Sequence, residues 1–247
     1  MFTIALWNLE RSAKKSADTR KAQQRQITAQ RANLLLLTEA DRALDIEGFQ
    51  GHFSDADSAE SGYPVVEAAA GIYHDWDAKP LRIPTVEKSH LALCLRFAAS
   101  PLGPLIVYCS IIPYKMWQVG GEVEVWQRHR ESTERQVADW KSILSDEANA
   151  GHSLIVGGDF NQTLDGTDRY GNAVSRDMLE GAFSSRLECL TRGDYSDVVG
   201  RHNVDHLAVD RRISATHNWR TTPWTGTVDQ RRLSDHNGLT VQLERRA

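Results

Sequence analysis

The sequence Gly-Gly-Asp-Phe-Asn at residues 157–161 closes the apolar run Ser-Leu-Ile-Val at 153–156. An apolar run bounded by glycines and preceded by a helical pattern predicts a buried strand. Side chains two positions apart in an extended chain point the same way, so we expect Asp159 and Asn161 to face one pocket and Phe160 to turn into the protein. A capped turn after the strand is the alternative that this stretch alone leaves open.

Length, composition and charge limit the class of protein. The chain has 247 residues and a net charge of −4, and it contains no repeat, linker or low-complexity tract. We therefore expect one domain over residues 1–247 with a sizeable core. The acidic balance excludes a uniformly basic nucleic-acid binder, so any attraction for phosphates has to be local.

Cysteine use and apolar runs bear on the compartment. Cys94, Cys109 and Cys189 each lie in an apolar stretch without a C-x-x-C pattern, which is typical of buried thiols in a reducing compartment. The first residues carry no basic leader, and the longest apolar run, 34–37, is far too short for a membrane span. We expect a cytoplasmic protein without a transmembrane segment.

Polar residues follow other predicted strands as well. The strand at 2–8 ends in Asn8, with Glu10 two positions later, and the four leucines at 34–37 run into Glu39. A carboxylate after such a run must leave the core or find a partner such as a metal. The patterns predict further strands at 70–73, 90–97, 105–112, 204–209, 213–219 and 238–243. They predict helices at 19–32, 127–149 and 175–183.

A basic segment covers residues 11–31, where seven Lys or Arg residues face one acid, Asp18, a possible N-cap. It is either a solvated helix face or a rim that attracts phosphates, with Lys14, Lys15 and Arg20 as candidate contacts. Tyr114 and Lys115 begin an aromatic and basic loop at 113–121 that suits base stacking or a lid packed on the domain.

Two more acids complete the constellation. Asp205 lies inside an otherwise apolar strand, and Asp235 with His236 sits between the last two strands. Carboxylates accompanied only by oxygen ligands suit Mg²⁺ or Mn²⁺. Asn and His side chains beside them can hold and neutralise a phosphoryl group during its transfer.

The order and spacing of these motifs resemble the endonuclease/exonuclease/phosphatase (DNase I-like) family across nearly the whole chain. The elements that carry the resemblance are Trp7-Asn8-Leu9-Glu10, Glu39, Gly158-Asp159-Phe160-Asn161, Val204-Asp205-His206 and Ser234-Asp235-His236. The resemblance implies a four-layered α/β sandwich, in which two mixed sheets pack face to face with helices outside.

The resemblance also implies roles. Glu39 resembles the main Mg²⁺ or Mn²⁺ ligand, assisted by Asn8 and Glu10, and Asp235 resembles a second acid near the metal. Asp159 resembles the residue that positions or deprotonates the attacking water, and Asn161 a phosphate contact. His236 resembles the imidazole at the scissile phosphate, oriented by Asp205.

Two departures from the family pattern matter. The family usually has His or Tyr as a phosphate contact where this chain has Ser110 or Ile111, and Thr38 stands where Gln often precedes the metal ligand. Tyr114 or Lys115 can supply the missing contact. The implied activity is phosphodiester hydrolysis, with nucleic acid as the leading substrate. A small metabolite or lipid headgroup, and a binding module without turnover, are the alternatives.

Overall fold

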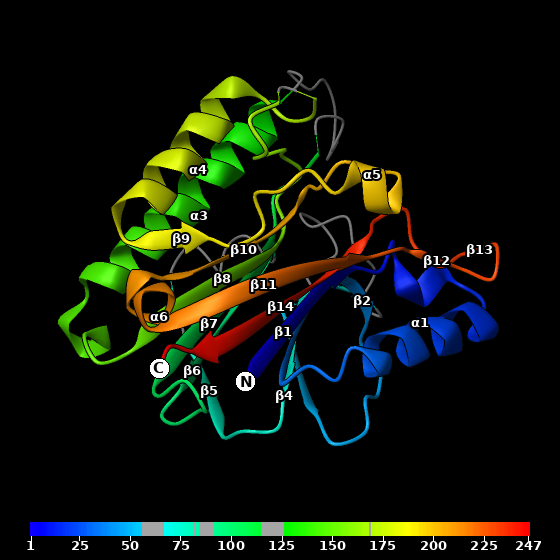
Figure 1. Ribbon diagram of the computed structural model, residues 1–247, viewed down its shortest axis with the longest axis horizontal. Coiled ribbons are helices and arrows are strands. Elements are labelled where there is room, and N and C mark those ends of the chain that lie inside the picture. Colours follow the sequence, from blue (N-terminus) through cyan, green and yellow to red (C-terminus); the bar gives the residue numbers. More distant parts are fainter. Residues whose placement is uncertain (56–66, 82, 84–90, 115–125, 168) are drawn as a thin grey trace.

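The computed structural model describes residues 1–247 except 56–66, 82, 84–90, 115–125 and 168. Its frame is a pair of six-stranded sheets (Figure 1). In spatial order, the first sheet contains β11 (His217–Trp224), β14 (Gly238–Arg245), β1 (Phe2–Asn8), β2 (Leu34–Asp41), β4 (Glu67–His74) and β3 (Gln50–Phe53). The second contains β5 (Ala78–Pro80), β6 (Ala92–Phe97), β7 (Leu105–Ile111), β8 (Ser153–Asp159), β10 (Asp205–Asp210) and β9 (Leu187–Cys189).

Each sheet has one parallel pair at its centre, β1 with β2 and β7 with β8, while the other pairs are antiparallel. A parallel pair needs a long crossover, which a helix usually supplies. Helix α1 (Ala17–Ala29) makes the first crossover and α3 (Gln127–Ser145) the second. The remaining elements of the described residues are α4 (Ala173–Ser185), α5 (Ser196–Val199), α6 (Arg211–Thr216), the 3-10 turns η1 (Ser12–Lys14) and η2 (Glu147–Asn149), and the hairpin β12 (Thr227–Val228) and β13 (Arg231–Arg232).

Three apolar layers hold these elements together. Alternate leucines of β2 divide between two of them: Leu34 and Leu36 face the second sheet, while Leu35 and Leu37 face α1. The third layer lies between the second sheet and the neighbouring helices α3 and α4, around Trp140. Alternate side chains of the strands thus pack against the other sheet on one face and against helices on the other face. The expected four-layered α/β sandwich is confirmed.

The structure corrects three local predictions. The stretch 213–219 is not one strand, because Asp210 accepts the Arg212 N–H at 2.9 Å and starts α6 before β11 begins. The N-cap of α1 is Ser16, not Asp18. Glu39 lies inside β2 rather than after it.

Other expectations can be compared directly with the structure. The three cysteines are free and buried, as predicted. Among the described residues, no helix is long and apolar enough to cross a membrane. Lys115 and most of the loop 113–121 lie outside the described residues.

Candidate active site

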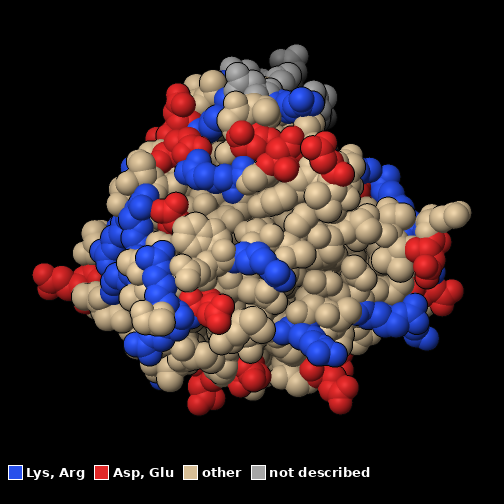
Figure 2. Space-filling model, viewed as in Figure 1, with Lys and Arg blue, Asp and Glu red and all other residues tan. Residues whose placement is uncertain are grey.

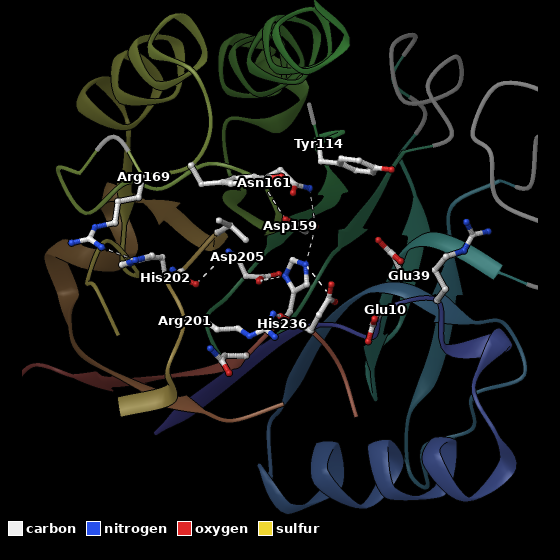
Figure 3. Close-up of a pocket in the computed structure, with 16 residues that line it drawn as sticks. Glu10, Glu39, Tyr114, Asp159, Asn161, Arg169, Arg201, His202, Asp205 and His236 are labelled. Carbon is white, nitrogen blue, oxygen red and sulfur yellow. Dashed lines mark hydrogen bonds and ion pairs between the residues drawn. The ribbon is translucent and has the colours of Figure 1, made fainter. Parts of the chain in front are cut away.

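A pocket of about 700 Å³ opens where β1, β2 and β8 end and β10 begins (Figure 3). The four strands come from both sheets, so the pocket straddles the sandwich. It is lined by Glu10, Arg11, Glu39, Tyr114, Asp159, Asn161, Arg169, Tyr170, Arg201, His202, Asn203, Val204, Asp205, Asp235, His236 and Asn237. This lining includes seven of the eight residues that the sequence assigned to catalysis or metal binding.

Asp159 and Asn161 are held as a rigid pair at the end of β8. The Asn161 backbone N–H and side-chain amide each donate to the Asp159 carboxylate at 2.9 Å. The same amide donates to the Ile112 carbonyl at 3.0 Å. Phe160 is fully buried, and Asp159 and Asn161 both line the pocket, as predicted. The reason is the capped turn that the sequence left open, because the Asn161 N–H bonds the Asp159 side chain and the strand ends at Asp159.

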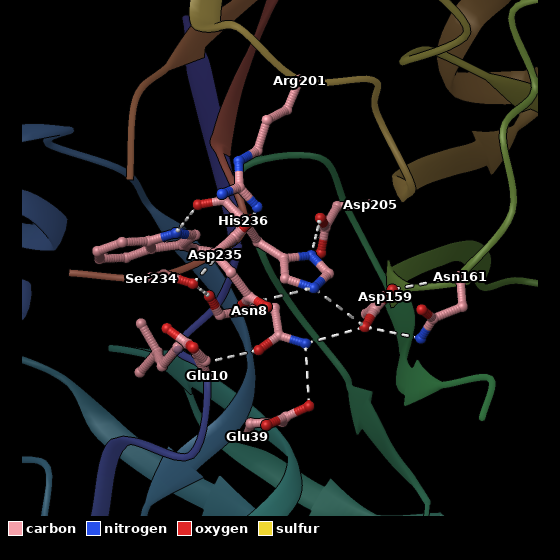
Figure 4. Close-up of polar contacts among 12 residues, drawn as sticks. Asn8, Glu10, Glu39, Asp159, Asn161, Arg201, Asp205, Ser234, Asp235 and His236 are labelled. Carbon is pink, nitrogen blue, oxygen red and sulfur yellow. Dashed lines mark hydrogen bonds and ion pairs between the residues drawn. The ribbon is translucent and has the colours of Figure 1, made fainter. Parts of the chain in front are cut away.

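Asn8, at the end of β1, connects the two sheets through its side-chain amide (Figure 4). Its Nδ2 donates to Asp159 Oδ2 at 2.9 Å and to Glu39 Oε1 at 3.3 Å. Its Oδ1 accepts the Glu10 N–H at 2.8 Å. In this orientation Asn8 is a donor to two carboxylates, and its oxygen is directed away from them.

His236 and Asp205 form a close pair. Nδ1 of the ring lies 2.7 Å from Asp205 Oδ2. The backbone of His236 is also anchored, because the Trp7 indole N–H donates to the His236 carbonyl at 3.1 Å. Burial disfavours the charged ring, but the charges of Asp205, Asp159 and Asp235 and the Asp205 hydrogen bond raise the pKa of His236 well above its usual value. These charges therefore favour the charged form of the ring.

The His236 ring faces Asp159, since Nε2 lies 3.8 Å from Asp159 Oδ2. Burial raises the pKa of Asp159 to about 7; His236 opposes this rise, whereas Asp205 and Glu39 add to it. A carboxyl group with a pKa near neutrality can exchange a proton with water at physiological pH.

The carboxylates next to Asn8 differ in their partners. Burial raises the pKa of Glu39, and its hydrogen bond to Asn8 at 3.3 Å is long. Glu10, in contrast, is ion-paired with Lys15 at 2.6 Å and with Arg232, and these contacts outweigh burial and lower its pKa. Asp235 is 40% exposed and reaches into the pocket.

Backbone strain concentrates at this pocket. Glu10, Arg11, Glu39 and Asn161 have φ angles of 51°, 57°, 52° and 48°, in the left-handed region that side chains other than glycine rarely adopt. All four line the pocket. Such strain persists where the surrounding structure enforces it, which is common at functional sites.

The end of β7 contributes no polar side chain to the pocket. The Ser110 hydroxyl donates to Gln136 at 2.7 Å, and Ile111 is buried, so neither replaces the phosphate contact of the family pattern. Close approach of the strands fixes this arrangement, because a Cβ on Gly158 would lie 2.0 Å from the Ser110 carbonyl oxygen. Tyr114, three residues beyond Ile111, does line the pocket.

Of the basic segment 11–31, Arg11 lines the pocket, whereas Lys14, Lys15 and Arg20 do not. Lys15 pairs with Glu10, and Arg20 donates to the Lys15 carbonyl at 2.7 Å and lies 3.6 Å from Asp41. Lys14 is exposed. On the face of the molecule in Figure 2, basic and acidic side chains are intermixed.

Among the pocket residues that were not predicted are Arg169, Tyr170, Arg201 and His202. They come from the segments between β8 and α4 and between α5 and β10. They follow no strand and form no spaced motif, so a search for polar residues at strand ends could not have found them.

No family model and no curated protein matches the sequence. Solved structures do. An AP endonuclease from Leishmania major superposes with a TM-score of 0.69 at 12% identity, over 100% of this chain and 88% of the other. A 3′ phosphatase from Neisseria bound to a product DNA hairpin gives 0.67 at 15% identity, over 99% and 100% of the two chains.

An endonuclease/exonuclease/phosphatase from Beutenbergia cavernae gives a TM-score of 0.59 at 12% identity, over 99% of this chain and 71% of the other. These likenesses extend over essentially the whole of this chain, and they agree with the two mixed sheets and outer helices described above. The chain therefore has the fold of the endonuclease/exonuclease/phosphatase proteins.

Proposed function

We propose that this protein is a divalent-metal-dependent phosphodiesterase and that its substrate is nucleic acid. The observation that carries the proposal is one pocket in which the His236 ring, whose charged form is favoured, lies 3.8 Å from Asp159, a carboxyl group with a pKa of about 7, and which Glu39 also lines. Positive charge opposite a water-activating group is what phosphoryl transfer needs, because the reaction is governed by positioning and by neutralising charge on the phosphate oxygens.

The donor set fits a hard cation. Glu39 is a carboxylate whose burial is offset only in part by one long hydrogen bond, and the other acids assigned to the metal, Glu10 and Asp235, also offer oxygen. Glu39 and Asp235 would hold the ion. Asp235 lies 3.7 Å from Arg232, whereas Glu10 is paired closely with both Lys15 and Arg232. When bound, a divalent ion supplies Lewis-acid polarisation of a phosphoryl oxygen. Asp159, Asp205 and His236 also lie close enough to share an ion, within 4.8 Å, but the short Nδ1 contact identifies a hydrogen-bonded pair.

The chain's own residues divide the remaining work. Asp159 accepts a proton from the attacking water. Asn161 and Asn8 fix the orientation of the Asp159 carboxyl group through three hydrogen bonds of 2.9 Å. His236, held charged by Asp205, neutralises a non-bridging oxygen of the scissile phosphate. Tyr114 lines the same pocket and supplies the phosphate contact that Ile111 cannot make.

Two observations weigh on the substrate. The solved structures with this fold include endonucleases and a phosphatase bound to a DNA hairpin, which favours nucleic acid. A small phosphoester is the second candidate, because the net charge is −4 and two of the three candidate backbone contacts, Lys15 and Arg20, have partners within the chain.

A substrate panel tests the proposal. Plasmid, abasic duplex, single-stranded DNA, RNA, a phosphoinositide and bis-p-nitrophenyl phosphate are incubated with Mg²⁺, with Mn²⁺ and with a chelator. Metal-dependent cleavage of a polynucleotide is expected. Turnover of only the small esters would shift the assignment to the second candidate, and turnover of none would leave a binding module.

A further inference from the structure

One wall of the pocket takes no part in the chemistry described above. Arg169, His202 and Arg201 lie on the side of His236 away from Glu39 and Glu10 (Figure 3). Arg169 comes from the segment after β8, and the other two residues come from the segment before β10.

Arg169 is oriented by a chain of two contacts. Its guanidinium lies 3.1 Å from His202 Nε2, and His202 Nδ1 lies 3.3 Å from Asp194 Oδ1. A guanidinium can only donate, so Nε2 of His202 accepts from Arg169. This contact orients Arg169, which lines the pocket.

Arg201 is held in a similar way by an uncharged acceptor. Its guanidinium donates to the backbone carbonyl of Asp235, directly beside His236 (Figure 4). A guanidinium has five N–H donors in a planar fork, and this contact uses one nitrogen. The remaining donors stay beside the residue that we assign to the scissile phosphate.

Other arginines of the chain behave differently. Arg232 pairs with Glu10, Arg212 with Asp210 and Arg192 with Glu180. Within the described part of the chain, neither Arg169 nor Arg201 forms an ion pair with a carboxylate. Two oriented guanidinium groups that pair with no carboxylate of the described residues therefore lie on this wall, on the same pocket as His236.

We propose that Arg169 and Arg201 form a subsite for a second phosphate of the substrate, beside the scissile one. The inference rests on the proposed phosphodiesterase function and narrows its substrate to diesters that carry a further phosphate. Arginine suits this role because its planar fork matches two phosphate oxygens at once. A polynucleotide provides such a group at every linkage, and a small substrate provides it as a terminal phosphate.

Two esters with the same scissile bond separate the subsite from the chemistry. One is thymidine 5′-(p-nitrophenyl phosphate); the other carries an additional 3′-phosphate. The preference is the ratio of their kcat/KM values with Mg²⁺. We expect the wild type to prefer the second ester, and Arg169→Ala and Arg201→Ala each to reduce that preference about tenfold, as for loss of a charge-assisted hydrogen bond. Arg201→Lys, which keeps the charge without the fork, should give an intermediate value.

The matched control is Arg220→Ala, which removes an exposed arginine from β11, outside the pocket lining. It should keep the wild-type preference. A preference that survives in the Arg169→Ala/Arg201→Ala double variant would overturn the subsite, and so would a wild type without any preference. A tenfold loss of the preference in Arg220→Ala would show that the overall charge of the protein, and not a subsite, causes the effect.

A binding measurement separates this inference from the proposed function. Calorimetry with thymidine 3′,5′-bisphosphate needs no turnover. Weaker binding by both arginine variants than by Arg220→Ala supports the subsite even if neither ester is hydrolysed, in which case only the proposed function fails. Equal binding by all three variants removes the subsite, whatever the activity. A polynucleotide competitor that displaces the bisphosphate only from the wild type and from Arg220→Ala identifies a polymer as the source of the second phosphate.

Discussion

The two strand–helix–strand units at the centres of the sheets invite comparison. Both β1–α1–β2 and β7–α3–β8 form a parallel pair, and both direct their strand ends toward the pocket. The first unit contributes from both strands, through Asn8 and Glu39. The second contributes from β8 alone, because Ser110 and Ile111 at the end of β7 are buried.

The end of β7 serves as a scaffold instead. Three successive carbonyl groups there each bind a side chain: Gln136 donates to Ile111 at 2.8 Å, Asn161 to Ile112 at 3.0 Å, and His129 lies 2.9 Å from that of Pro113. The topology brings the strand ends of both units to the pocket. The strand register decides whether a strand end contributes side chains to the pocket or backbone carbonyl groups that anchor other side chains. The first unit should thus be sensitive to loss of charge, and the second to loss of anchoring.

The largest effect is expected in the first unit. Glu39→Gln keeps the shape of the side chain but removes the charge that a hard cation needs. Activity with Mg²⁺ should fall on the order of a thousandfold, several kcal/mol in the barrier. The urea midpoint should stay the same or rise, because a carboxylate with a burial-raised pKa is lost. Glu147→Gln, at an exposed position in η2, is the control, and wild-type turnover by Glu39→Gln at limiting Mg²⁺ would remove Glu39 from the site.

The second largest effect is expected for the pair His236 and Asp205. His236→Ala and Asp205→Asn should each reduce kcat about a hundredfold, and the double variant should lose little more than the worse single variant, because the pair acts as a unit. Fully additive losses would contradict this. Asp177→Asn, an exposed change on α4, controls for the loss of one charge.

The same pair makes a prediction about pH. Asp205 raises the pKa of His236, so the charged ring persists to higher pH in the wild type. Removing the carboxylate lowers that pKa, and the alkaline limb of the pH–rate profile of Asp205→Asn should move to lower pH. An unmoved limb would mean that the ring charge does not control the rate.

A smaller effect is expected in the second unit. Gln136→Leu leaves the buried Ser110 hydroxyl and the Ile111 carbonyl without this partner, which should cost about 2 kcal/mol of unfolding free energy. A severalfold fall in kcat should accompany it, because Asn161 is anchored on the neighbouring carbonyl. Urea unfolding and steady-state kinetics measure both, and Gln127→Leu, exposed on the same helix, is the control. Lower stability with unchanged kcat would confine Gln136 to a structural role.

The smallest effect concerns the basic segment of the first unit. Lys14→Ser should lower the salt dependence of polynucleotide binding by about one unit of log–log slope, as for one lost phosphate contact. Lys15→Ser and Arg20→Ser should change the slope less, because both side chains have partners within the chain. Lys141→Ser, exposed on α3, provides the baseline. An unchanged slope for Lys14→Ser would make the segment an ordinary solvated surface.

Strand ends were the predictable part of this molecule. Alternation in the four leucines of β2 gave the faces of that strand, because side-chain direction has period two. The short helix α6 was mistaken for a strand, since six residues contain too few turns for a helical period to emerge. Arg169 and Arg201 were missed because loop residues reach the pocket through tertiary contacts that no local pattern encodes.

The pocket residues with a left-handed backbone conformation lower the stability of the protein while serving the pocket. Glu10, Arg11 and Glu39 each hold a backbone conformation that costs about 1 kcal/mol or more for a residue with a side chain. Glycine at any of them would relieve that cost and remove a charge from the pocket. A laboratory evolution experiment that rewards folding alone should therefore accumulate glycine at these positions and drift toward a sturdier, inactive protein. We therefore expect these residues to be retained where the proposed reaction is under selection.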